Sequence, residues 1–131
     1  MNNDLAAVKK AKVEKMHAML DACIRRDFPV FAGTELNAFG QKIVDDFSEP
    51  ALAKYLEEFR KGAALLSAHT ILGSRGAGYL SNWSEKHFAS RKEKNAFFVR
   101  FGEKVLPAAG AALPGDLSGM TPEEILKKAG A

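Results

Sequence analysis

Residues 73–94, GSRGAGYLSNWSEKHFASRKEK, combine a glycine-rich turn with aromatic and cationic side chains. Backbone N–H groups in glycine-rich turns can point at an anion. Lys and Arg replace the counterions of phosphates, and aromatic rings can stack on bases. The pattern predicts contact between residues 75–104, here called the basic segment, and DNA, RNA or another polyanion. The candidate nucleic-acid-binding residues are Arg75, Tyr79, Trp83, Lys86, His87, Arg91, Lys92 and Lys94.

The same pattern is also typical of ordinary helix packing. No Gly-Lys-Ser/Thr follows the glycines, so the turn is not a P-loop, and the helical segment before it does not suit a dinucleotide-binding turn. We interpret the turn as a helix C-cap at Gly73 followed by a chain reversal. Tyr79 and Trp83 would then pack in the core, and the cations would lie on a solvated face. A helix-turn-helix is a further alternative, but the turn is long for that motif.

The distribution of charge favours the basic segment over the rest of the chain. The net charge is +3 and the pI is about 9.0. Residues 1–68 are neutral, residues 69–104 carry +4, and residues 105–131 carry −1. A single helix through this stretch would place Lys86, His87, Arg91 and Lys94 on one face, and a break at Ser90 would weaken that arrangement.

Catalytic and metal-binding patterns are not visible in the sequence. Cys23 and the three histidines are far apart, without His-x-x-x-His or Cys-x-x-Cys spacing. The adjacent acid pairs at 45–46 and 57–58 would point in different directions on a helix. We therefore expect a binding protein rather than an enzyme, with no metal and no cofactor. A site assembled from residues distant in sequence stays open.

The C-terminal tail suggests a second function, as a protein-interaction module such as an adaptor, inhibitor or accessory subunit. Residues 107–119, PAAGAALPGDLSG, predict a tether. Thr121 and Pro122 then begin a short helix to Ala129, which would either dock in a partner's groove or fold onto its own domain. The candidate partner-binding residues are Ile125, Leu126 and Ala129.

The N-terminal helix offers a similar interaction surface. Val13, Met16, Leu20 and Cys23 lie at near-heptad spacing and could pair with a second copy of the chain. The stripe is too short for a coiled coil.

Hydrophobic spacing, caps and breakers predict helices throughout. Thr34 and the 48–50 Ser-Glu-Pro sequence are expected helix starts, and the 90–93 Ser-Arg-Lys-Glu sequence fits a capping box. Gly40 is expected to allow close approach of two helices. The expected helices cover residues 5–26, 35–47, 50–72, 79–89, 90–106 and 122–129.

The fold class follows from these elements. We predict an all-α, single-domain bundle of five or six helices, with a short C-terminal helix on a Pro/Gly/Ala-rich tether. The expected division is a core domain at 1–106, a linker at 107–121 and a terminal helix at 122–131. The single cysteine excludes an intramolecular disulfide, and no export signal or membrane-length apolar run is visible. We therefore predict a cytoplasmic protein that does not bind membranes.

Overall fold

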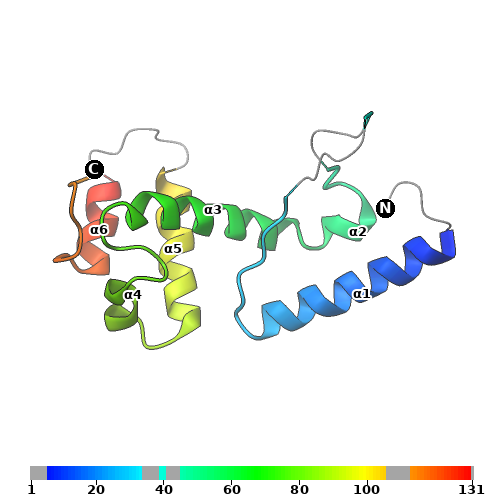
Figure 1. Ribbon diagram of the computed structural model, residues 1–131, viewed down its shortest axis with the longest axis horizontal. Coiled ribbons are helices and arrows are strands. Elements are labelled where there is room, and N and C mark those ends of the chain that lie inside the picture. The colour runs from blue at the N-terminus through cyan, green and yellow to red at the C-terminus, as the bar shows by residue number, and fades with distance from the viewer. Residues whose placement is uncertain (1–5, 34–38, 41–44, 106–112, 131) are drawn as a thin grey trace.

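The computed structural model describes residues 6–33, 39–40, 45–105 and 113–130. These residues form an all-α, single-domain bundle without a strand, as the sequence predicts (Figure 1). The helices are α1 (Ala6–Arg25), α2 (Pro50–Ala53), α3 (Leu56–Gly73), α4 (Asn82–His87), α5 (Arg91–Val105) and α6 (Pro122–Ala129).

The core lies where α4, α5 and α6 gather around the C-terminal half of α3 (Figure 1). The closest approach is between α3 and α5, since a Cβ atom added to Gly102 would overlap the backbone of Ala64. A glycine at this position therefore lets the two helices touch. The core residues are apolar and almost fully buried, and include Leu65, Leu72, Trp83, Phe97, Phe98, Phe101, Leu117 and Ile125.

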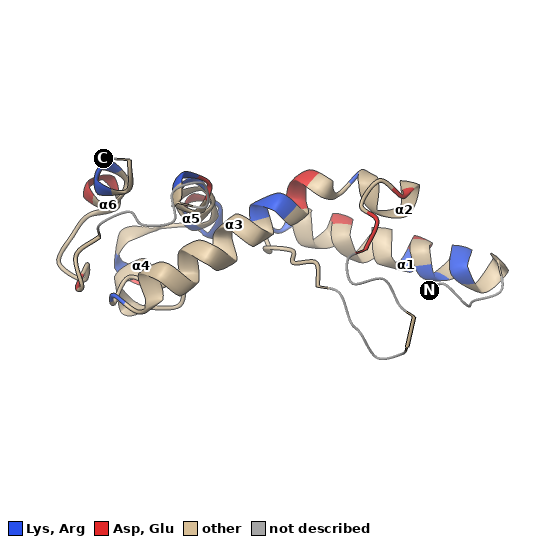
Figure 2. Ribbon diagram, turned by 90° about the horizontal axis from the view of Figure 1, so that it is seen from above, with Lys and Arg blue, Asp and Glu red and all other residues tan. Residues whose placement is uncertain are grey.

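The second half of α1 packs against α2 and the start of α3, and Tyr55 is the anchor. The buried Tyr55 hydroxyl donates a hydrogen bond to Asp21 Oδ1 at 2.7 Å, and His17 Nε2 donates to the Ala51 carbonyl at 2.8 Å. The bond from Tyr55, together with the nearby Lys54, lowers the pKa of Asp21. These contacts fix residues 17–24 of α1 and leave its first turns pointing away from the bundle, as Figures 1 and 2 show.

The glycine turn is a Schellman motif, in which the cap residue is Gly76 rather than Gly73. Gly76 has a φ of 80°, its N–H donates to the Gly73 carbonyl, and the Ala77 N–H donates to the Leu72 carbonyl. The prediction placed the cap at Gly73, but this residue is the last of α3. Only Gly76 needs the left-handed backbone that favours glycine.

Helix α1 ends in the same motif without a glycine. Asp27 has a φ of 55°, its N–H donates to the Ile24 carbonyl, and the Phe28 N–H donates to the Cys23 carbonyl. Asp tolerates the left-handed region better than most residues. The chain then passes over α3, where a Cβ atom on Gly62 would overlap the Val30 carbonyl oxygen.

Several predicted elements agree with the structure. Two separate helices, α4 and α5, lie within residues 79–105, and the Ser90 hydroxyl accepts from the Glu93 N–H at the start of α5. Helix α6 has the predicted bounds, with the full Thr121 and Glu124 capping box. The proline at position 50 begins α2, although Glu49 takes the N-cap position.

Two helix predictions need correction. The expected helix at 50–72 is interrupted at Lys54 and Tyr55, where the chain turns so that Tyr55 can reach α1. The expected helix at 35–47 is not helical at residues 39–40 and 45–47, its only described parts. Gly40 adopts a φ of 82°, which a helix does not allow. Phe39 is fully exposed, and a Cβ added at Gly40 would meet no atom within 4 Å, so Gly40 is not at the close helix approach expected from the sequence. Thr34, the expected start of this helix, lies outside the described residues, as do residues 35–38 and 41–44.

The segment before α6 packs onto the bundle. Residues 107–112 of the expected linker lie outside the described residues, but residues 113–121 are described. Leu117 is fully buried, and its N–H donates to the Arg75 carbonyl at 2.9 Å. This part of the tail therefore belongs to the core and is no free tether.

Candidate nucleic-acid interface

In the glycine turn, the N–H groups of Gly76 and Ala77 and one nitrogen of the Arg75 guanidinium form hydrogen bonds within the chain. Gly76 and Ala77 donate their N–H groups to the cap of α3. Arg75 Nη1 donates to the Ile71 carbonyl at 2.8 Å and to the Ser74 hydroxyl at 3.1 Å. The turn therefore closes α3 and holds the 113–121 segment, and these N–H groups do not face an anion.

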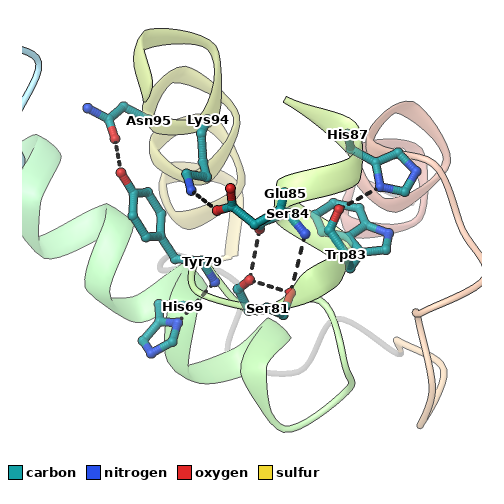
Figure 3. Close-up of polar contacts among 10 residues, drawn as sticks. His69, Tyr79, Ser81, Trp83, Ser84, Glu85, His87, Lys94 and Asn95 are labelled. Atoms are coloured by element: carbon teal, nitrogen blue, oxygen red, sulfur yellow. Dashed lines mark hydrogen bonds and ion pairs between the residues drawn. The ribbon is translucent and has the colours of Figure 1, made fainter. Parts of the chain in front are cut away.

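Tyr79 links three parts of the bundle (Figure 3). Its hydroxyl donates to Asn95 Oδ1 at 2.6 Å, and its N–H donates to His69 Nδ1 at 3.1 Å. Its ring meets Phe98 edge-on, and burial raises the pKa of the phenol. Tyr79 is thus held in place by internal contacts on both its backbone and its side chain.

Trp83 is a core residue. Only 4% of its surface is exposed, and its indole N–H donates to the Met120 carbonyl at 2.7 Å. Its ring packs against Phe88 and Phe97. The exposed His87 lies over the same ring, at 4.6 Å between centroids, and donates from Nδ1 to the Trp83 carbonyl. Because the ring is covered, it cannot stack on a base in this conformation.

Lys94 is neutralised within the bundle. Its ammonium lies 2.7 Å from Glu85 on α4 and 4.7 Å from the centre of the Tyr79 ring (Figure 3). Only 14% of its side chain is exposed. This cation joins α4 to α5 and adds little to the charge that a ligand would meet.

Arg91 and Asn95 hold the end of α1 against α5. The Arg91 guanidinium lies over the Phe28 ring at 4.0 Å, and its Nη1 donates to the Arg26 carbonyl at 3.1 Å. Asn95 Nδ2 donates to the Asp27 carbonyl at 2.7 Å. The two residues satisfy carbonyls at the C-terminus of α1 and so position the whole helix.

The predicted cationic face is therefore divided. Lys86, His87, Arg91 and Lys92 are exposed, but the non-helical residues 88–90 separate α4 from α5, so no continuous helix aligns these side chains. Nucleic-acid binding by the basic segment stays a prediction, with most of its aromatic and part of its cationic surface used inside the bundle.

A second basic region lies on α1 and was missed in the sequence. Residues 6–15, here called the basic arm, are all exposed except the half-buried Val13. The arm carries four lysines and one glutamate, a net charge of +3. Figure 2 shows its lysines at the end of the molecule opposite α6. Averaging over residues 1–68 hid this cluster, because acidic residues later in that stretch cancel its charge.

A groove forms where the end of α1 meets α3 and α5. Its volume is about 370 Å³. It is lined by Ile24, Asp27, Phe28, Pro29 and Val30 from α1 and the chain after it, by Glu58, Lys61, Gly62 and Leu65 from α3, and by Lys92, Asn95, Ala96 and Val99 from α5. It brings one predicted site residue, Lys92, beside an apolar surface.

The candidate partner-binding residues of α6 lie mostly inside the molecule. Ile125 is 0% exposed and Ala129 is buried, while Leu126 is half-buried. In this conformation the apolar face of α6 packs on the chain's own core and is not open to a partner. Partner binding by α6 stays a prediction that requires the helix to leave the bundle.

Each histidine forms a hydrogen bond with a backbone group, and within the described ranges no three His, Cys, Asp or Glu side chains are grouped as a metal would require. The described helices are each too short or too polar to cross a bilayer.

Comparison with protein-family models, with curated protein sequences and with solved structures finds no significant match.

Proposed function

We propose that the protein binds duplex DNA through the basic arm of α1, by contacts to phosphates that do not depend on sequence. The observation that carries the proposal is the exposure of this cationic stretch of helix, which projects from the bundle with little of its surface packed. Isolated helices shorter than about 12–15 residues are only marginally stable in water, and the arm packs little of its surface. An anionic partner would stabilise it by pairing with its lysines.

The placement of the lysines favours a groove over a flat acidic surface. Successive helical residues are rotated by about 100°, so Lys9, Lys10 and Lys15 lie roughly 100° to 140° apart around the axis. A flat partner would meet one side of such a helix and leave the other lysines unpaired. Phosphates on both walls of a nucleic-acid groove can meet all three.

The dimensions favour B-form DNA. An α-helix with its side chains is about 10–12 Å wide, and the DNA major groove is about 12 Å wide. The deep, narrow major groove of A-form RNA does not admit a helix. The alanines of the arm, Ala6, Ala7 and Ala11, keep its girth small.

The composition of the arm indicates that it contacts phosphates rather than base edges. Lysine ammonium groups act as point charges on phosphates, whereas specific base contacts come mostly from Arg, Asn and Gln. The arm contains none of these three residues and no aromatic ring. We therefore expect little sequence preference and little affinity for unstacked single strands.

The test is fluorescence anisotropy of the full chain with labelled duplex DNA, duplex RNA and single-stranded DNA, from roughly 50 to 200 mM salt. The proposal expects the tightest binding to duplex DNA, weakening steeply with salt, together with a gain in helical circular dichroism. Equal binding of polyglutamate at matched charge would indicate an acidic protein partner. Preference for single strands, or no binding at low salt, would contradict the proposal.

A further inference from the structure

Tyr55 joins the middle of α1 to the break between α2 and α3. Only 2% of its surface is exposed, and its hydroxyl lies 2.7 Å from Asp21 Oδ1 and 3.1 Å from the His17 carbonyl oxygen. The His17 ring meets the Tyr55 ring edge-on, and its Nε2 donates to the Ala51 carbonyl. The side chains of His17, Asp21, Lys54 and Tyr55 are here called the Tyr55 cluster.

The hydrogen bond from Tyr55 to Asp21 has an ionised acceptor. This bond, together with the Lys54 ammonium 3.5 Å from Asp21 Oδ2, lowers the pKa of Asp21, so its carboxyl is charged at neutral pH. Lys54 also lies 4.6 Å from the centre of the Tyr55 ring. Hydrogen bonds to an ionised group are roughly twice as strong as neutral ones. The Tyr55 hydroxyl therefore holds residues 17–21 of α1 against the start of α3.

The Tyr55 cluster lies directly after the basic arm, at the point where the packing of α1 begins (Figure 1). Leu20 is buried within the held turn, whereas the arm is exposed apart from the half-buried Val13. Each N–H of an α-helix donates to the carbonyl four residues earlier, so the N–H groups of residues 17–20 serve the carbonyls of residues 13–16. Because starting a helix is the unfavourable step, a turn already held in place lets the arm extend from it.

We propose that Tyr55 and Asp21 are positioning residues for DNA binding, which keep the basic arm helical and directed away from the bundle before DNA arrives. This inference rests on the proposed function of the arm. A segment that is already ordered in its bound conformation loses less conformational freedom on binding, and so binds more tightly. Tyr55 and Asp21 therefore raise the affinity of the arm for DNA without touching a phosphate.

The test compares two variants that each remove one phenol hydroxyl from the full chain. Tyr55→Phe breaks the bond to Asp21, whereas Tyr79→Phe breaks the bond to Asn95 and leaves the Tyr55 cluster intact. We expect Tyr55→Phe to weaken duplex DNA binding by about three- to tenfold, with a larger gain in helical circular dichroism on binding. The salt slope should stay that of the parent, because every arm lysine is still present. Tyr79→Phe should change none of these.

A rescue variant separates ordering of the arm from other effects of the lost hydroxyl. Val8 is exposed and β-branched, so Val8→Ala raises the helix propensity of the arm without disturbing the core. Adding Val8→Ala to Tyr55→Phe should restore part of the lost affinity. A Tyr55→Phe loss that Val8→Ala does not reduce would contradict ordering of the arm as the cause.

A second measurement needs no DNA. Amide hydrogen exchange of residues 10–16 in the free protein should be faster in Tyr55→Phe, by about three- to tenfold, and unchanged in Tyr79→Phe. Asp21→Asn keeps an acceptor for Tyr55 but removes its charge, so it should give a smaller change in the same direction. This variant also decides the question if Tyr55→Phe does not fold.

Equal effects of the two tyrosine variants, or unchanged exchange of residues 10–16 in both Tyr55→Phe and Asp21→Asn, would overturn the proposal. A flattened salt slope in Tyr55→Phe would also overturn it, since phosphate contacts and not helix order would then have been lost. If the parent does not bind duplex DNA, the proposed function fails, and the exchange data still show whether the Tyr55 cluster orders the arm.

Discussion

The basic segment and the basic arm have similar net charge but different surroundings. Residues 75–104 carry +4 and residues 6–15 carry +3. In the first region Lys94 is paired with Glu85 and Arg91 covers Phe28. In the second, Lys10 lies 4.0 Å from Glu14, and the two side chains are 81% and 66% exposed. Exposed pairs of this kind contribute little. The net charge of a region therefore gives its excess of cations over acids, and packing decides how many of those cations a ligand can reach.

The largest expected effect is a loss of stability on replacing Trp83, the buried ring of the basic segment. Trp83→Ala removes a buried ring and the partner of the Met120 carbonyl, and should lower the free energy of unfolding by about 3–5 kcal/mol in a urea titration. Trp83→Phe, which keeps most of the packing, should cost less. If the Trp83→Ala protein has normal stability but no longer binds nucleic acid, the Trp83 ring contacts the nucleic acid and is not a core residue.

The second prediction tests whether α6 belongs to the core. Ile125→Ala should lower the free energy of unfolding by about 2–5 kcal/mol, because Ile125 is fully buried. Leu126→Ala is the matched control on the half-buried side and should cost clearly less. Equal and small losses in the two variants would mean that α6 does not pack as described.

The third prediction concerns the crossing of α3 and α5, which holds the basic segment in place. Gly102→Ala forces its new methyl group against the Ala64 backbone and should cost about 1–3 kcal/mol of stability. Gly115→Ala, where no atom lies within reach of the new Cβ, should stay within about 0.5 kcal/mol of the parent. Thermal and urea unfolding compare the two, and a neutral Gly102→Ala would contradict the close crossing.

The smallest effect compares the two Schellman caps. Asp27→Gly relieves a left-handed backbone and should raise the free energy of unfolding by up to about 1 kcal/mol, whereas Gly76→Ala should lower it by about the same amount. The readout is the urea midpoint. If Asp27→Gly is clearly destabilising, the Asp27 carboxylate has a role that its described contacts do not include.

Local patterns predicted much of the fold. The capping residues at Ser90 and Thr121 located the starts of α5 and α6, because these hydroxyls accept hydrogen bonds within their own first turn. The same local reasoning failed at Gly73, because the left-handed residue of the Schellman cap is Gly76, three residues later. The break at Tyr55 could not be predicted, because its cause is a contact with Asp21, distant in sequence.

The candidate site was harder to predict than the fold. Lys86 and Lys94 are both lysines near aromatic residues, and only the arrangement of α4 and α5 leaves one exposed and pairs the other with Glu85. The arm lysines were visible in the sequence, but their exposure depends on tertiary contacts that hold α1 at His17 and Asp21, beyond the arm. No local sequence pattern could predict the groove, because its lining residues come from three segments that are distant in the sequence.

The central claim is that the basic arm, and not the basic segment, meets the DNA phosphates. The direct measurement is the salt dependence of duplex DNA binding for two matched triple variants, Lys9→Gln/Lys10→Gln/Lys15→Gln and Lys86→Gln/Lys92→Gln/Arg100→Gln. The account predicts that the arm variant weakens binding and flattens the salt slope by up to about three units, while the second variant keeps the parent slope. A flattened slope in the second variant with an unchanged arm variant would contradict it.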